Sequence, residues 1–270
     1  MAGEGPQGRV LIAAGSDSSG GAGIQADIKT VTALGGYAAT AVTAITVQNT
    51  LGVSDIYDVP ADIVERQMRA VIDDIGLDAF KTGMLQSREI IEAVERVLED
   101  VDVPLVVDPV MVATSGDALT NEDTKQSLIS LLFPRAALVT PNVEEAEMLA
   151  GMEVYSLDDM RHAARALRDF GAAAALITGG ELEKGRLTDL LLTDEGERLF
   201  ETERLDTRHT HGTGCTLASA IATGLAQGLS LESAVTRAHA FVQAAIKAAP
   251  GFGQGQGPLG HAHAIPPFKA

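Results

Sequence analysis

The chain has 270 residues, 46% of them hydrophobic and 4% aromatic, and its 37 acidic and 20 basic side chains give a formal net charge of −17. This charge disfavours nucleic acid and anionic membranes as general partners. The single cysteine excludes an internal disulfide framework and suits a reducing, cytoplasmic compartment. The length suits one mainly aliphatic core, so we predict a single domain over residues 1–270, with flexible ends at 1–8 and 265–270.

The first predicted element is a buried strand at residues 9–14, where the chain is a short apolar run. A glycine-rich segment follows at 15–23, and the spacing of apolar residues after it predicts a helix at 24–34. Strand, glycine-rich loop and helix in this order are typical of a ligand-binding loop, but a flexible connector is an equal alternative. The glycine spacing matches neither the dinucleotide-binding pattern nor the P-loop pattern.

The rest of the chain alternates between apolar runs and amphipathic segments, which predicts a mostly parallel sheet with helices on both faces. Strands are predicted at 38–47, around Phe80, and at 105–107, 138–139 and 174–177, with an antiparallel hairpin at 187–192 and 198–200. Helices are predicted at 60–73, 87–98, 121–132, 142–149, 157–170, 216–225 and 231–248. The uncharged stretch 30–54 is too rich in threonine, glycine and amides to face lipid.

Polar or adaptable side chains recur just after the predicted strands. Because ligands in open α/β sheets bind outside the carboxyl ends of the strands, we expect these side chains to lie together at one edge of the sheet. They are Asp17, Gln48, Met84, Asp108, Asn142 and Thr178.

The segment 210–215, Thr-His-Gly-Thr-Gly-Cys, directly precedes a predicted helix. Its two glycines leave little side-chain bulk, so backbone N–H groups converge at a helix N-terminus, where an anion is favoured. The same field is expected to lower the pKa of Cys215 from its reference value of about 8.5. A phosphate site beside a thiol suggests phosphoryl transfer, and the alternative is a glycine-rich turn before a helix with a small buried cysteine.

These segments resemble the hydroxymethylpyrimidine and phosphomethylpyrimidine kinases of thiamine biosynthesis, in the ribokinase-like superfamily. The resemblance runs from about residue 10 to 264. The motifs that carry it are AGSDSSGGAGIQADIKT at 14–30, TVQNT at 46–50, KTGML at 81–85, VVDPVM at 106–111, TPNVEEAE at 140–147 and THGTGCTLASAIA at 210–222.

The resemblance implies a ribokinase-like three-layer α/β/α sandwich with a mostly parallel central sheet and a small antiparallel hairpin. It implies ATP-dependent phosphorylation of 4-amino-5-hydroxymethyl-2-methylpyrimidine to its monophosphate and then to the diphosphate. Magnesium would assist, and the protein would be a cytoplasmic homodimer. A water-excluding lid is expected at 111–119.

The resemblance also assigns roles to residues. Cys215 would occupy the catalytic-base position, with Gly212, Thr213 and Gly214 facing the transferring phosphoryl group. Asp108 and Glu145 would hold magnesium. The pyrimidine site would comprise Gly15, Asp17, Asp27, Gln48, Met84 and Val110, and the nucleotide site Asn142, Glu145, Thr178, Gly180 and Thr210. Asp27 could equally be a structural acid.

The chain departs from this family where many relatives carry lysine, because threonine stands at 114 and 178. Magnesium and the backbone N–H groups would then neutralise more of the nucleotide charge, or Lys81 or Arg208 would approach. The paired histidines at 209, 211, 261 and 263 fit a zinc site less well than a loop role for His211.

Three other functions remain open. A pyridoxal or pyridoxine kinase shares the fold and acts on a hydroxymethyl group of a nitrogen heteroaromatic, although Gln48 favours the aminopyrimidine. A non-catalytic pyrimidine-binding protein is disfavoured by the retained Cys215, Asn142 and Glu145. A sugar kinase is disfavoured because cysteine replaces the aspartate expected at position 215.

Overall fold

A computed structural model describes residues 7–111, 121–183 and 185–266. Thr114, residues 112–119 of the predicted lid and most of both predicted ends lie outside these ranges. The strands are β1 Arg9–Asp17, β2 Tyr37–Asn49, β3 Gly52–Asp58, β4 Ala79–Thr82, β5 Leu105–Val107, β6 Leu138–Val139, β7 Ala175–Glu183, β8 Arg186–Thr193 and β9 Gly196–Glu203. The α-helices are α1 Gly23–Ala33, α2 Ala61–Asp74, α3 Arg88–Leu98, α4 Glu122–Ser127, α5 Val143–Ala150, α6 Leu157–Asp169, α7 Thr213–Ala226 and α8 Leu231–Lys247.

The described strands form one sheet in the order β3-β2-β1-β4-β5-β6-β7-β8-β9. Neighbours from β2 to β7 pair in parallel, and the pairs β2–β3, β7–β8 and β8–β9 are antiparallel. The expected mostly parallel sheet and the β8–β9 hairpin are confirmed. The edge strand β3 was not predicted, because most of its residues are exposed and no buried apolar run marks it.

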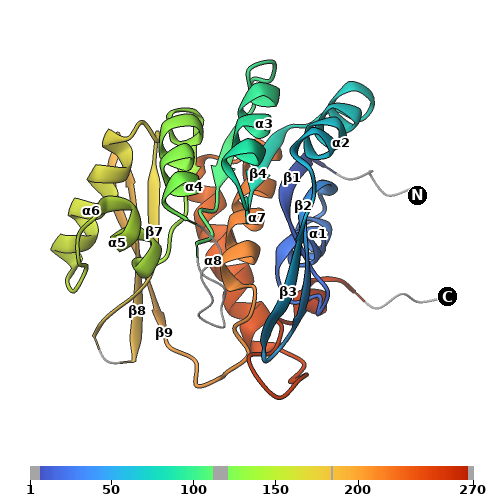
Figure 1. Cartoon of the computed structure of the whole chain (residues 1–270). Coiled ribbons are helices and arrows are strands. Elements are labelled where there is room, and N and C mark those ends of the chain that lie inside the picture. Colours follow the sequence, from blue (N-terminus) through green and yellow to red (C-terminus); the bar gives the residue numbers. More distant parts are fainter. Residues whose placement is uncertain (1–6, 112–120, 184, 267–270) are drawn as a thin grey trace.

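Two hydrophobic cores lie on opposite faces of the sheet, so the fold is the expected three-layer α/β/α sandwich (Figure 1). Leu11 and Ala13 of β1 enter one core with side chains of α2, α3, α5 and α6, whereas Val10 and Ile12 enter the other with α1, α7 and α8. Successive residues of β1 thus feed opposite faces, which is why this strand is apolar throughout.

Two element boundaries differ from the sequence prediction in ways that shape the site. Strand β1 continues to Asp17, because Ser16 and Asp17 still pair with Ile45 and Thr46 of β2. Helix α7 begins at Thr213 rather than at Thr216, so Thr213 joins Cys215 in its first turn.

The sheet order places the candidate residues at one edge. Strand β1 lies between β2 and β4, so the chain crosses to opposite sides after β1 and β3, and ligands favour such a switch point. Helix α7 packs on β1, β4 and β5, with its first turn at their carboxyl ends. Within the described ranges, every helix is too short or too polar to cross a membrane.

Candidate active site

The first turn of α7 lies close to the glycine-rich loop after β1. Gly212 is the N-cap with φ of 85°, and a Cβ there would lie 2.0 Å from the carbonyl oxygen of Gly21, so only glycine fits. Thr213 donates from Oγ1 to the carbonyl of Thr210 at 2.6 Å, and its N–H donates to the same oxygen. The predicted catalytic segment is thereby fixed as a close-packed turn.

A buried charge cluster lies beneath this turn. The side chain of Lys81 is fully buried, and its Nζ lies 3.0 Å from Asp27 Oδ1 and 3.6 Å from Asp108 Oδ2. Ser219, one turn after Cys215 on α7, donates to Asp27 Oδ1 at 2.6 Å. Burial disfavours the charge on Lys81, but Asp27, Cys215 and Asp108 together raise its pKa above the usual value.

The acids of this cluster are incompletely compensated. Burial raises the pKa of Asp108 to about 6, although Lys81 opposes the shift. Burial also raises the pKa of Asp27. Among the described residues, Oδ2 of each carboxyl group lacks a hydrogen-bond partner. Such orphaned buried oxygens are uncommon outside functional sites and favour a bound cation at the open side of Asp108.

The expected lowering of the Cys215 pKa is wrong. Burial raises the pKa of this thiol to about 12, and Asp27 and Asp108 raise it further, whereas Lys81 and the N–H of Gly23 lower it. The helix N-terminus therefore does not outweigh desolvation and two nearby carboxylates. At neutral pH the group is a thiol, with part of the residue still exposed.

Asp17 ties the glycine-rich loop to the turn before α7. Its carboxylate accepts from the backbone and hydroxyl of Ser19 and from the N–H groups of Gly21 and Ala22. His211 Nε2 lies 2.9 Å from Asp17 Oδ2. Burial opposes ionisation of Asp17, but these hydrogen bonds hold its pKa below the usual value. Asp17 therefore orders the loop, and its predicted role in the pyrimidine site is indirect.

A cavity of about 250 Å³ lies between the β2–β3 turn and residues 255–256, with Gln48 and His211 in its wall. Its volume is below the usual range for drug-sized ligands and suits a single ring. Met84 packs over Gly15, where a Cβ would lie 2.4 Å from Met84 Cε. Val110 is partly buried, and Asp27 lies in the charge cluster rather than in this wall.

Asn142 and Glu145 form a capping box at the start of α5. Asn142 Oδ1 accepts from the N–H of Glu145 at 2.8 Å, and Glu145 Oε2 accepts from the N–H of Asn142 at 3.0 Å. Glu145 Oε1 accepts from the N–H of Met111 at 3.2 Å, and burial followed by repulsion from Asp108 raises the Glu145 pKa to about 8.

These residues fit magnesium with few direct protein ligands, since this ion retains water. Within the described ranges no three His, Cys, Asp or Glu side chains form a metal-binding group. Asp108, whose Oδ1 faces Gly214 in the first turn of α7, is then the better direct ligand, while Glu145 keeps one lone-pair direction on each oxygen for a metal-bound water.

The end of β6 and the middle of β7 form the predicted nucleotide side. Thr178 donates from its N–H to the carbonyl of Pro141 at 3.0 Å. Gly180 is needed for packing, because a Cβ there would lie 2.8 Å from Met160 Sδ. Gly179, which sequence reasoning missed, has φ of 79° and open space at the Cβ position. The only sequence feature that could have indicated Gly179 was its position between Thr178 and Gly180.

The segment 253–261 closes the site from the carboxyl-terminal side. The carbonyls of Gly253 and Gln254 accept from Arg208, so this guanidinium is engaged away from the phosphate turn. The N–H of His211 donates to Gly257 at 3.2 Å. His261 Nε2 lies 2.9 Å from Thr216 Oγ1, whose own proton goes to the carbonyl of Gly212.

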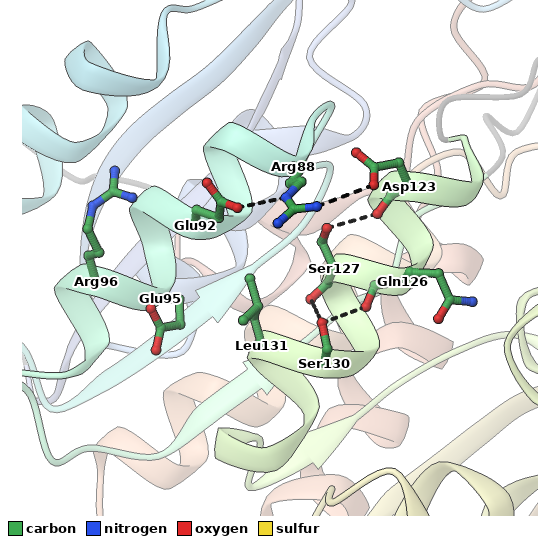
Figure 2. Close-up of a pocket in the computed structure, with 9 residues that line it drawn as sticks. All are labelled: Arg88, Glu92, Glu95, Arg96, Asp123, Gln126, Ser127, Ser130 and Leu131. Carbon is green, nitrogen blue, oxygen red and sulfur yellow. Dashed lines mark hydrogen bonds and ion pairs between the residues drawn. The ribbon is translucent and has the colours of Figure 1, made fainter.

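A second groove, between α3 and α4, lies apart from these residues (Figure 2). Its charged groups pair with one another, as Arg88 does with Glu92 at 2.7 Å and with Asp123 at 3.7 Å. Ser127 and Ser130 donate to backbone carbonyls of the preceding helical turn. This surface therefore offers few unsatisfied groups to a ligand. It is lined by Arg88, Glu92, Glu95, Arg96, Asp123, Gln126, Ser127, Ser130 and Leu131.

Comparison with known proteins identifies the family. The phosphomethylpyrimidine kinase family matches residues 17–260, and the chain belongs to it. It is 48% identical over 256 residues to the hydroxymethylpyrimidine/phosphomethylpyrimidine kinase of Streptomyces coelicolor, covering 95% of both chains. It superposes on the ADP complex of Bacillus subtilis pyridoxal kinase with a TM-score of 0.88 at 37% identity, covering 95% of this chain and 98% of that one. For phosphomethylpyrimidine kinase from Clostridium difficile 630 the TM-score is 0.77 at 38% identity, with 89% and 98% covered.

Proposed function

We propose that this chain transfers the γ-phosphoryl group of ATP to the hydroxymethyl group of 4-amino-5-hydroxymethyl-2-methylpyrimidine, and then phosphorylates the monophosphate, in thiamine biosynthesis. The observation that carries the proposal is the first turn of α7, where glycines bring backbone N–H groups beside Cys215 and the Lys81 cluster. The single-ring cavity at Gln48 is also lined by His211, which directly precedes the N-cap of this turn. Family membership and the Streptomyces relative support the same activity.

In this proposal the bond between the γ-phosphorus and the bridging oxygen breaks, ADP leaves, and a bond forms from phosphorus to the hydroxymethyl oxygen. Backbone N–H groups of Gly212 and Gly214 stabilise the charge on the transferred group, while the N–H of Thr213 holds the turn through the Thr210 carbonyl. Because such transition states are loose, the proton leaves the hydroxyl late. A thiol that is neutral at rest can therefore position the hydroxyl by a hydrogen bond, and only its minor thiolate form, whose charge Lys81 offsets, can take the proton.

Magnesium would be held by Asp108, with Glu145 and Asn142 holding its waters, and bound magnesium neutralises phosphate charge. Thr178 and Thr210 would contact the nucleotide, and Gly179 would let it approach the backbone closely. Gly180 would serve by packing β7 on α6.

Pyridoxal kinase activity is the second candidate. The observation that favours it is the TM-score of 0.88 to Bacillus subtilis pyridoxal kinase, against 0.77 to a phosphomethylpyrimidine kinase. The side chain that favours the pyrimidine is Gln48, whose amide can pair with an amino group and a ring nitrogen together.

The sheet edge supports a homodimer, whereas the cytoplasmic location stays a prediction. Strand β3 is an edge strand, and apolar side chains of the β2–β3 hairpin are exposed at Ile45, Val47, Leu51 and Tyr57. Such an apolar edge is rarely left uncovered, and a second copy of the chain would cover it. Light scattering of the wild type and of Leu51→Glu tests this, with a monomeric wild type as the contrary result.

The activity is tested by incubating the protein with ATP, magnesium and one acceptor, and resolving the products by mass. The acceptors are the hydroxymethylpyrimidine, its monophosphate and pyridoxal. Mono- and diphosphate pyrimidine products with little pyridoxal phosphate are expected. Pyridoxal phosphate without pyrimidine diphosphate would favour the second candidate, and pyrimidine binding without any product would reject the enzyme.

A further inference from the structure

The side-chain amide of Gln48 is held at both ends. In the structure the Nε2 of the amide lies 3.4 Å from His211 Nε2, and its Oε1 lies 3.0 Å from Thr46 Oγ1. The oxygen and nitrogen of an amide have nearly the same shape, so their positions are assigned from the surrounding hydrogen bonds.

The His211 end requires an acceptor. The Asp17 carboxyl group accepts from four N–H and O–H donors besides His211, as an ionised carboxylate does, and a carboxylate only accepts. His211 Nε2, at 2.9 Å from Asp17 Oδ2, therefore carries a proton. An amide NH₂ of Gln48 beside it would place two donors face to face, whereas the amide carbonyl accepts a share of that proton.

The Thr46 end requires a donor. The hydroxyl of Thr46 has one proton, and the carbonyl of Ser16 lies 3.0 Å from Oγ1 to accept it. The remaining lone pairs of Oγ1 accept from an NH₂ group. Both ends therefore agree on one direction, with the carbonyl of Gln48 toward His211 and its NH₂ toward Thr46.

We propose that Asp17, His211 and Thr46 are positioning residues that hold the Gln48 amide in this one direction and so make the site selective for a 4-aminopyrimidine over its 4-oxo analogue. The inference rests on the proposed function, since Gln48 must face the ring. After both clamping bonds, Gln48 keeps one acceptor lone pair and one N–H for a ligand.

The two rings present opposite hydrogen-bonding orders. The aminopyrimidine places an N–H donor beside a ring-nitrogen acceptor, whereas the oxo form places a carbonyl acceptor beside an N–H donor. An amide free to flip would read both, but a clamped amide pairs with one and leaves the other with opposed groups. Unpaired buried polar groups of this kind support discrimination on the order of 100-fold or more.

The test compares kcat/KM for the aminopyrimidine and for its 4-oxo analogue. The wild type should prefer the amino form by roughly 100-fold, and His211→Phe and Thr46→Val should each reduce that ratio about tenfold. His211→Gln retains an N–H donor and should restore most of the ratio. Thr223→Val removes a similar buried hydroxyl within α7, bonded to Ser219 O at 2.7 Å, and should keep it.

A second readout does not depend on turnover. With ¹⁵N-labelled histidine, the His211 resonance, assigned by its loss in His211→Gln, should show a protonated Nε2. An unprotonated Nε2 would overturn the proposal. So would a wild-type ratio near one, or a ratio unchanged in both His211→Phe and Thr46→Val. Failure of the wild type to phosphorylate the aminopyrimidine would instead reject the proposed function.

Discussion

Asp17 and Asp108 are buried to the same degree, at 3% and 4% exposure, yet their pKa values move in opposite directions. Asp17 accepts hydrogen bonds from a whole loop, and its pKa is lowered. Asp108 has Lys81 at 3.6 Å and an oxygen without a hydrogen bond, and burial raises its pKa. Burial alone therefore does not predict charge state: hydrogen bonds decide it.

The contrast separates two tasks. Asp17, whose carboxylate accepts several hydrogen bonds, orders the glycine-rich loop. Asp108, which has an oxygen without a hydrogen bond, can still bind a ligand beneath the first turn of α7. In the charge cluster two buried acids share one lysine, which lowers the stability of the fold. Such a loss of stability is typical of functional sites.

The largest expected effect tests whether Cys215, beside the charge cluster, carries the chemistry. Cys215→Ala should lower kcat by about 10²–10⁴-fold, the range of a positioned proton acceptor, with little change in the urea midpoint. Steady-state kinetics and urea unfolding measure the two quantities. Cys215→Ser, which keeps a group able to hydrogen-bond, should fall between, and full activity in the alanine variant would contradict the assigned role.

Removing the ammonium group of Lys81 should destabilise the charge cluster itself. Lys81→Met leaves the buried Asp27 and Asp108 without a cation and should cost about 3–5 kcal/mol of unfolding free energy. Adding Asp27→Asn should recover part of this loss. Lys29→Met, which removes a lysine bonded to the Gly20 carbonyl at the surface, is the matched control and should cost far less. Equal losses in the two lysine variants would contradict the buried pairing.

The pH dependence of stability should differ between the two acids. The folded-state pKa of Asp108 is raised to about 6, so its contribution is full below its unfolded value and is lost as pH rises to about 6. The contribution of Asp108 to the free energy of unfolding should fall by about 3 kcal/mol over this range. Asp108→Asn should remove this fall while lowering activity. Unfolding curves between pH 4 and pH 8 measure this. Glu145 and Asp189, with pKa values raised to about 8 and about 7, lower stability over overlapping ranges that also begin at their unfolded values, and Asp108→Asn should leave those falls in place.

The smallest expected effect concerns Asp17 and the glycine-rich loop that it orders. Asp17 has a lowered pKa, so its contribution is present above its unfolded value and is lost as pH falls through the folded value. Asp17→Asn should cost about 1.5–3 kcal/mol at neutral pH, the usual range for hydrogen bonds to a charged group. A variant as stable as wild type would show that the loop orders itself without this carboxylate.

The sequence was informative where function depends on neighbours along the chain. Glycines around Thr213, the helix start at Asn142, and the apolar run before Asp108 each predicted a local structure that the fold confirms. The antiparallel edge at β3 was missed because exposure removes the apolar alternation from which strands are predicted.

The site's electrostatics depend on contacts that the sequence separates widely. Lys81 meets Asp27 across 54 positions, and His211 meets Asp17 across 194. No spacing rule predicts such pairs, and the wrong expectation for the Cys215 thiol has the same origin. The helix terminus is visible in the sequence, whereas the two carboxylates that outweigh it are brought there only by the sheet.

The ties from residues 257 and 261 to His211 and Thr216 have a consequence for how the protein is made. Synthesis proceeds from the amino terminus, so the sheet, α7 and the charge cluster can assemble while the segment that fastens the phosphate turn has not yet been translated. The chain would then become compact on the ribosome before it becomes catalytically competent. The nascent chain would bind and hydrolyse little ATP until α8 and the segment 253–261 are complete.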